Sequence, residues 1–346
     1  MPGISSDAFL ADPTSAPADF RGADDLLPLG DRRDGLFYRY TPEIKLAVRV
    51  ALAVSRPLLL LGPSGCGKSS LVFNLARLMR RRYYEFVVQA RTEAQELFYR
   101  FDAIRRLGEA QASAAAGAVS AATNWRSCYP FIVPGPLWWV FDPASAARRG
   151  ASIQEADSFP SPVDPGRWPD QFLEPLYRPA TALTNHEPAV LLIDEIDKAE
   201  PDFPNNLLVP LGSQQFAVEE TGDVISFGAG SASPATAPLI VITSNREREL
   251  PNAFIRRCIV LEIKAPTKQE LATLAREAFR QFDDSANDRF IAIADKLIGL
   301  RGEERLSTAE FLDVVRAIDA LKADETDWGQ IILRTTWTVA DTIEPQ

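Results

Sequence analysis

The sequence is poor in the residues that many catalytic and structural sites require. Its single histidine, His186, argues against histidine-based catalytic triads and His-rich metal centres. Its three cysteines, Cys66, Cys128 and Cys258, lack the spacing of a disulfide framework or a metal site, which is typical of a reducing cytoplasm. No hydrophobic run approaches the length of a membrane span, and no signal-peptide pattern opens the sequence. The composition therefore predicts a cytoplasmic protein with no membrane partner.

Positive charge is also scarce relative to negative charge. Lysine and arginine number 37 against 47 aspartates and glutamates, so the formal net charge is −10 at pH 7. A protein that binds duplex DNA usually presents a basic face to the phosphates, so this balance argues against a nucleic-acid partner. The 346 residues suffice for two or three structural units with a large buried core.

Apolar runs alternate with amphipathic segments along the first three quarters of the chain. Residues 57–61 are continuously apolar, which predicts a strand buried on both faces of a parallel sheet. By the same pattern, further strands are predicted at 83–90, 189–197, 238–245 and 258–263, and helices at 41–54, 67–79 and 92–111. This alternation predicts an α/β fold with a three-layer αβα core around a parallel sheet.

Changes in composition divide the chain into three parts. Residues 1–34, rich in Ala, Asp, Pro and Ser, are predicted to be a flexible tail. Residues 35–265 form the predicted αβα core, with an Ala-, Pro- and aromatic-rich insertion at about 111–187 and a hairpin at about 214–227. Residues 266–346 show only helical patterns, including a capping box, and predict a small all-helical lid domain.

Residues 62–69 match the phosphate-binding pattern G-x-x-x-x-G-K-[ST] in full. The glycines allow backbone N–H groups to converge on phosphates, and the N-terminus of the following helix adds its dipole. Lys68 is expected to reach the β- and γ-phosphates, and the hydroxyl of Ser69 is expected to coordinate Mg²⁺. The predicted nucleotide-binding residues are Gly62, Pro63, Ser64, Gly65, Cys66, Gly67, Lys68, Ser69 and Ser70.

Polar residues end two of the apolar strands. Asp194 follows the run 189–193 and is expected to hold Mg²⁺ through water beside the phosphate loop. Glu195 comes next and suits an enzyme that polarises water, as the general base of hydrolysis. Asn245 ends the strand at 238–245, where its amide can orient the attacking water or contact the γ-phosphate. Together these residues turn nucleotide binding into a prediction of hydrolysis.

Two arginines, Arg256 and Arg257, follow a short predicted helix. They can simply offset the helix dipole. Alternatively, one of them projects into the nucleotide site of a neighbouring subunit as an arginine finger and stabilises transition-state charge. We favour the second interpretation, with Arg257 ahead of Arg256.

Four segments, GPSGCGKSS, LLIDEIDKA, ITSN and AFIRRC, followed by a helical region, resemble the motifs of the AAA+ ATPases in the family's order. Over residues 35–335 the chain is similar to the MoxR-type branch, which has segments like YPFIVPGPLWW and QQFAVEETGDVISF. The resemblance assigns residues 62–69 to Walker A and Asp194 with Glu195 to Walker B. It assigns Asn245 to sensor 1 and Arg257 to the finger.

The same resemblance implies cofactors and partners. It implies ATP as the nucleotide, with Mg²⁺, bound at each interface of a homo-oligomeric ring that is usually a hexamer. It also implies chaperone-like remodelling of a protein partner, often one with a von Willebrand factor A domain. The stretch 142–187 is longer than compact family members need, and it is either a partner-binding addition or a surface elaboration.

The chain departs from the MoxR pattern in the third helix of the lid. Family members commonly carry the sensor 2 arginine at the start of that helix. Here the helix start contains Ser307, Thr308 and Glu310, so sensor 2 is either absent or supplied by Arg301 or Arg305.

Three functions fit these motifs. The leading one is a Mg²⁺-dependent ATPase that remodels a protein partner. The second is an ATP-regulated assembly switch in a signalling or defence system, and the third is a DNA-acting motor, which the acidic balance disfavours. A small-molecule phosphotransferase has no use for Glu195, because a substrate hydroxyl attacks the phosphate there.

Overall fold

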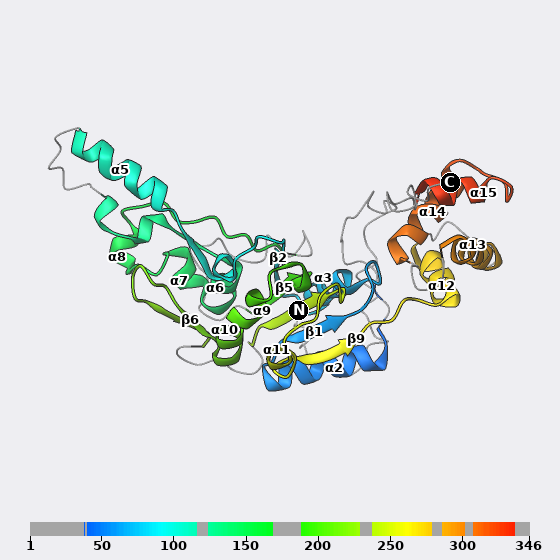
Figure 1. Ribbon diagram of the computed structural model, residues 1–346, viewed down its shortest axis with the longest axis horizontal. Helices are drawn as coiled ribbons and strands as arrows, with labels where there is room; N and C mark the ends of the chain where they lie inside the picture. Colours follow the sequence, from blue (N-terminus) through cyan, green and yellow to red (C-terminus); the bar gives the residue numbers. More distant parts are fainter. Residues whose placement is uncertain are drawn as a thin grey trace, which may run out of the picture.

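A parallel sheet lies at the centre of the computed structural model, which describes residues 38, 40–115, 124–168, 188–228, 237–278, 286–301 and 307–335 (Figure 1). Its five strands run in the order β2-β5-β8-β1-β9, and every neighbouring pair is parallel. Their bounds are Leu58–Leu61 (β1), Arg82–Val87 (β2), Ala189–Asp194 (β5), Leu239–Ser244 (β8) and Ile259–Glu262 (β9). The predicted strands are therefore present.

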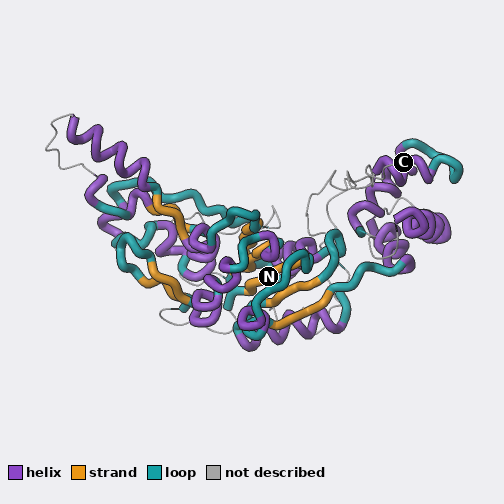
Figure 2. The backbone as a smooth tube through the Cα atoms, viewed as in Figure 1, coloured by secondary structure: helices purple, strands orange, loops and turns teal. Residues whose placement is uncertain are grey.

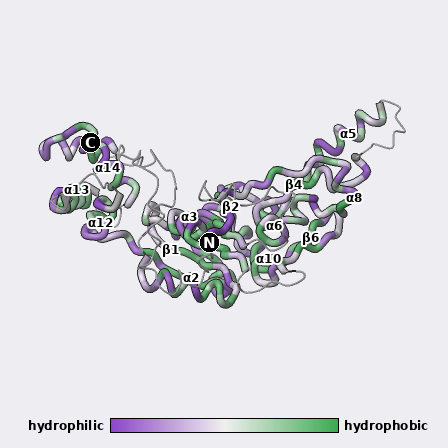
Figure 3. Tube along the Cα trace, turned by 180° about the vertical axis from the view of Figure 1, so that it is seen from behind, coloured by the Kyte–Doolittle hydropathy of each residue, from purple (hydrophilic) through white to green (hydrophobic). Residues whose placement is uncertain are grey.

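Alternate residues of the strands face two separate hydrophobic layers. Leu58 and Leu60 pack with the helices α2 (Pro42–Val54) and α3 (Lys68–Leu78), whereas Leu59 packs with the layer on the other face. Figure 2 shows helices on both sides of the sheet, and Figure 3 shows apolar residues concentrated around β1, α2 and α6. A strand buried on both faces needs apolar side chains in both alternating sets, which explains the continuous Leu run. The predicted three-layer αβα fold is confirmed.

The single helix predicted at 92–111 is wrong. The segment is divided into α4 (Ala94–Phe98), the short strand β3 (Tyr99–Phe101) and α5 (Ala103–Ala115). β3 pairs antiparallel with β4 (Ile132–Pro134). Glu93 and Glu96 form a capping box at the start of α4.

Tertiary packing explains the break. Tyr99 is 2% exposed, and its ring meets that of Trp138 edge-on, with the ring centroids 6.4 Å apart. Gly135 lies so close to the end of α4 that a Cβ there would be 2.5 Å from the carbonyl oxygen of Leu97. Burial of an aromatic side chain contributes about 2 kcal/mol, more than the few tenths separating helix propensities, so the long-range contacts decide the backbone.

Part of the insertion and part of the following segment pack in the hydrophobic layer that contains Leu59. Trp138 and Trp139 are fully buried in that layer. The helices are α6 (Pro136–Phe141), α7 (Pro143–Ala147), α8 (Ile153–Ala156), α9 (Asp202–Asn206), α10 (Leu208–Ser213) and α11 (Asn252–Ile255). The expected hairpin is present as β6 (Gln215–Ala217) and β7 (Val224–Ser226). Residues 116–123 and 169–187 of the insertion lie outside the described residues.

Among the described residues, four helices follow the sheet and contain a hydrophobic core of their own, built around Phe290, Phe311 and Trp328. They are α12 (Lys268–Ala278), α13 (Ala286–Arg301), α14 (Thr308–Ala320) and α15 (Trp328–Thr335). Figure 1 places these helices at one end of the molecule and α5 at the other, with the sheet between them. None of the described helices is both long and apolar enough to cross a bilayer. The predicted boundaries at 34/35 and 265/266 stay predictions, and the tail 1–34 lies outside the described residues.

Candidate functional site

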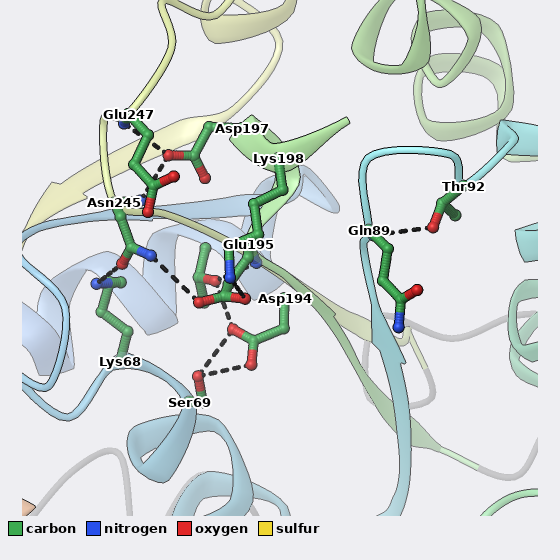
Figure 4. A network of polar contacts seen from close by, with 11 residues as sticks. Lys68, Ser69, Gln89, Thr92, Asp194, Glu195, Asp197, Lys198, Asn245 and Glu247 are labelled. Carbon is green, nitrogen blue, oxygen red and sulfur yellow. Dashed lines mark hydrogen bonds and ion pairs between the residues drawn. The ribbon is translucent and has the colours of Figure 1, made fainter. Parts of the chain in front are cut away.

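The predicted site residues other than Arg256 and Arg257 meet at one edge of the sheet. Leu61 pairs with Ser244, and Ile193 pairs with Ile242, so the three central strands end at the same level. Gly62, Glu195 and Asn245 directly follow β1, β5 and β8 in the sequence. Parallel strands present their carboxyl ends at one edge, which brings these residues together. Figure 4 shows Glu195 and Asn245 close to Lys68.

The phosphate loop, residues 62–67, connects β1 to α3 through backbone conformations that favour glycine. Gly65 and Gly67 have φ values of 75° and 91°. A Cβ on Gly62 would lie 2.3 Å from the carbonyl oxygen of Ile263, so the loop passes directly against the neighbouring backbone. α3 begins at Lys68 without a side-chain cap, and its first N–H groups therefore suit an anionic ligand.

The ammonium group of Lys68 is buried among neutral oxygen atoms. Lys68 is 5% exposed, and its Nζ donates to the carbonyl oxygens of Gly62 at 2.8 Å and Pro63 at 2.7 Å. A third hydrogen bond, of 2.7 Å, reaches Oδ1 of Asn245. Within the described part of the chain no carboxylate pairs with this ammonium group. A buried cation without a counter-charge fits the phosphates that the sequence predicts here.

Ser69 and Asp194 form the candidate metal site. The Ser69 hydroxyl donates to Asp194 at 2.8 Å from Oδ1 and 3.0 Å from Oδ2. Asp194 is 3% exposed and also accepts a hydrogen bond of 2.6 Å from Thr243 Oγ1. A hydroxyl and a carboxylate side by side are the hard oxygen donors that Mg²⁺ prefers, so the donor set fits this ion.

Glu195 is held by three neighbours. Its backbone has the left-handed conformation, φ 59° and ψ 49°, and its N–H donates to Thr243 Oγ1 at 2.8 Å. Asn245 Nδ2 donates to Glu195 Oε1 at 3.2 Å, and Lys198 Nζ lies 2.5 Å from Oε2. The amide of Asn245 thus connects the cation of Lys68 to the carboxylate of Glu195, as Figure 4 shows.

Three residues of this network are absent from the sequence-based site: Thr243, Asp197 and Lys198. Asp197 is 2% exposed, and its Oδ2 accepts from the backbone N–H groups of Asn245 at 3.0 Å and Glu247 at 2.8 Å. The hydrogen bond and charge of Glu195 raise the pKa of Lys198. A short helical turn at Ile196–Lys198 brings the Lys198 ammonium group to Glu195. The i,i+3 spacing of Glu195 and Lys198 was the available sequence signal.

The structure does not bring the arginine pair to the phosphate loop of its own chain. Arg256 and Arg257 precede β9, whose first residue, Ile259, pairs with Leu58 at the start of β1. The pair therefore lies at the sheet edge opposite the phosphate loop, with both side chains exposed. It lines a cavity of about 310 Å³ between α2, α10 and α11. Arg257 donates to the carbonyl oxygen of Ala253 at 3.0 Å, whereas Arg256 has no side-chain partner among the described residues.

The lid contacts the phosphate loop through the N-terminus of α14. Thr308 donates its backbone N–H to the carbonyl oxygen of Gly65 at 3.2 Å, and a Cβ on Gly65 would lie 2.3 Å from Ser307 Oγ. Ser307 caps α14 by accepting from the N–H of Glu310. The two candidate replacements for sensor 2 are untested, since Arg305 and the side chain of Arg301 lie outside the described residues.

An aromatic residue also lies beside the loop. The Tyr38 ring carbon Cε2 would be 3.3 Å from a Cβ on Gly67, and the ring meets Tyr40 edge-on. Burial raises the pKa of Tyr38, so its phenol stays protonated at neutral pH. The sequence contained no motif that marked Tyr38, because it lies outside the phosphate-loop pattern.

Residues 57–258 match the family model of the AAA domain, dynein-related subfamily. The chain belongs to this family. The match extends from the start of β1 to the end of the turn that carries Arg256 and Arg257, and so includes the phosphate loop, Asp194, Glu195 and Asn245. No curated protein matches the sequence.

Solved structures of RuvB from Thermotoga maritima resemble the AAA protein weakly. A RuvB mutant matches at 16% identity with a TM-score of 0.42, covering 85% of this chain and 67% of that chain. A second mutant matches at 16% identity and a TM-score of 0.41, covering 85% and 66%. The RuvB Holliday junction branch migration motor matches at 15% identity and a TM-score of 0.37, covering 84% and 65%.

Proposed function

We propose that this AAA protein hydrolyses ATP with Mg²⁺ in a ring of subunits and uses the energy to remodel a protein partner. The observation that carries the proposal is the bridge from Lys68 through Asn245 to Glu195. It connects the group that binds phosphate to the group that activates water. A nucleotide-binding module without hydrolysis has no need for this connection.

In the proposed reaction, Lys68 and the N-terminus of α3 bind the β- and γ-phosphates. Ser69 and Asp194 hold Mg²⁺, which neutralises charge on the phosphate oxygens. Glu195 accepts a proton from water as the water oxygen bonds to the γ-phosphorus. The bond between this phosphorus and the β,γ-bridging oxygen breaks, leaving ADP and phosphate. Asn245 orients the water against the γ-phosphate.

The arginine pair supports a ring with shared sites. Arg256 and Arg257 lie at the sheet edge opposite the phosphate loop and are exposed, which supports action on a neighbouring subunit. A head-to-tail interface of this kind generates a ring if its rotation closes. The resemblance to the MoxR-type branch supports a hexamer and a partner with a von Willebrand factor A domain, and it supports ATP over GTP.

A second function, an ATP-regulated assembly switch, is favoured by the ion pair of Glu195 with Lys198. Both carboxylate oxygens of Glu195 are engaged, one by Asn245 and one by Lys198. A base whose oxygens are both engaged gives slow ATP hydrolysis. In this alternative ATP drives ring formation, and slow hydrolysis ends it.

Phosphate release and ring formation, measured on the same samples, separate the two functions. Purified protein is incubated with ATP and Mg²⁺, and its mass is followed by light scattering while phosphate is assayed. Sustained turnover in the assembled state supports the ATPase. ATP-dependent assembly with negligible turnover supports the switch. Binding of duplex DNA that weakens steeply with salt would contradict both in favour of a DNA-acting motor.

The shared site has its own test. Subunits with Arg257→Ala have an intact phosphate loop, and subunits with Lys68→Ala have an intact arginine pair. When the two variants are mixed before assembly, about a quarter of random interfaces combine both intact halves. We expect activity above that of either variant alone, and an Arg256→Ala series run in parallel identifies which arginine acts. Absence of recovery in both series, with assembly intact, would contradict action between subunits.

A further inference from the structure

Arg56 contacts the backbone that carries the arginine pair. It lies between the end of α2 and the start of β1, some two hundred positions from its partners in the sequence. Its Nε donates to the carbonyl oxygen of Arg257 at 2.9 Å, and its Nη2 donates to that of Cys258 at 3.1 Å. Nη2 also donates to the carbonyl oxygen of Arg256.

These three carbonyl groups belong to the turn between α11 and β9. α11 ends at Ile255 after a single turn, and β9 begins at Ile259, so residues 256–258 lie outside regular secondary structure. Only an arginine presents several donors in a fixed, planar arrangement, which allows one side chain to bind successive carbonyl groups. The contacts fix the backbone from which both arginines of the pair project.

The residues that contact this turn directly precede β1, the strand that leads to the phosphate loop. Arg56 precedes β1 by one residue, Pro57, and the loop starts at Gly62, directly after β1 ends. The carbonyl of Pro57 accepts from the N–H of Ile259 at 2.8 Å, which ties the turn to the same end of the strand. One short strand thus connects the phosphate loop of one site to the arginine pair offered to the next site.

We infer that Arg56 is a positioning residue for the arginine finger: it fixes the turn at 256–258 so that the finger reaches the nucleotide of the neighbouring subunit. The inference rests on the proposed function, since it requires a shared site. Arg56 itself touches no nucleotide. The alternative is that Arg56 only stabilises the fold of its own subunit or the strand β1. The two explanations differ in which nucleotide site loses activity when Arg56 is removed: the site of the neighbouring subunit or the site of the same subunit.

The test mixes Arg56→Ala subunits with Lys68→Ala subunits before assembly. Arg56→Ala alone should lose at least about tenfold in kcat, within the range for impaired arginine fingers, with the KM for ATP nearly unchanged. Mixing should restore activity, because Arg56→Ala subunits retain intact phosphate loops and Lys68→Ala subunits retain supported arginine pairs. Arg49→Ala is the matched control: it removes the same charge from an exposed position on α2 and should leave kcat unchanged.

Folding is checked with a second variant. Arg56→Lys keeps the charge but cannot bind three carbonyl groups at once, so it should show the same recovery on mixing after a smaller loss of kcat. If kcat stays at the wild-type value in both variants, the inference is wrong. A raised KM without recovery on mixing also overturns it, because Arg56 would then support its own phosphate loop.

The outcome also separates the inference from the proposed function. Recovery in mixtures of Arg257→Ala or Arg256→Ala with Lys68→Ala, but not in mixtures of Arg56→Ala with Lys68→Ala, overturns the inference and leaves the shared site intact. Absence of recovered ATPase activity in every mixture overturns the shared site, and it overturns the inferred role of Arg56 as well.

Discussion

Lys198 Nζ lies 2.5 Å from Glu195 Oε2, so the proposed catalytic base is ion-paired. The ion pair occupies one of the two carboxylate oxygens that can receive a proton from the attacking water in the proposed reaction. We therefore expect Lys198 to restrain the proposed hydrolysis until it leaves Glu195.

The Lys198→Met variant should release this restraint. Glu195 Oε2 then becomes available to water, and we expect the basal kcat for ATP hydrolysis to rise several-fold, an effect of about 1 kcal/mol or less for a pair that is this exposed. The measurement is steady-state phosphate release at saturating ATP. Lys322→Met, at an exposed position after the end of α14, is the control for loss of a lysine. A rate in Lys198→Met that is below the wild-type rate would mean that Lys198 assists catalysis instead.

The same ion pair predicts a pH dependence. Glu195 raises the pKa of Lys198 above its ordinary value of 10.5. A raised lysine pKa means that the pair contributes to stability fully below pH 10.5, and that the contribution is lost as the pH rises through the folded pKa. Between pH 7 and pH 9 the wild type should therefore show no activation from lysine titration, and the ratio of Lys198→Met to wild-type rates should stay constant. A ratio that falls towards one by pH 9 would contradict this.

Asp197 should act on catalysis through Asn245. Its carboxylate accepts the N–H groups of Asn245 and Glu247 and fixes the loop after β8. Asp197→Asn replaces one acceptor oxygen by a donor amide. The free energy of unfolding should fall by about 1–3 kcal/mol, the cost of disturbing a buried charged hydrogen bond. It should also lower kcat more than it raises KM for ATP, whereas Asp202→Asn at an exposed position should change neither. An unchanged kcat with lowered stability would limit Asp197 to folding.

Gly65 tests the contact between lid and phosphate loop. In Gly65→Ala the new Cβ meets Ser307 Oγ at 2.3 Å in addition to the strain of a positive φ. Gly222 has nearly the same φ, 76° against 75°, and open space around its Cβ, so Gly222→Ala carries the backbone strain alone. That strain costs about 1–2 kcal/mol. We expect Gly65→Ala to weaken nucleotide binding, measured by titration calorimetry, while Gly222→Ala leaves it unchanged. Equal effects of the two changes would show that the lid contact does not matter for binding.

The sheet and most of the site could be predicted from the sequence because their signals are local. Continuous apolar runs such as residues 58–61 need two covered faces, and parallel strands then place Asp194 and Asn245 at the edge that holds the phosphate loop. The break at Tyr99 could not be predicted, because its cause is a contact with Trp138 that no local pattern encodes. The contacts of Arg56 could not be predicted either, because they join residues about two hundred positions apart in the sequence.

The central claim, that Glu195 activates water for ATP hydrolysis, is tested most directly by phosphate release from Glu195→Gln under saturating ATP and Mg²⁺. Glutamine keeps the size of the side chain and can still bond to Asn245, but it cannot accept the proton. The account predicts ATP binding and assembly like the wild type, with kcat reduced by about 10²–10⁴. Glu200→Gln, at an exposed position five residues later, should retain full activity. Hydrolysis by Glu195→Gln at the wild-type rate would contradict the account.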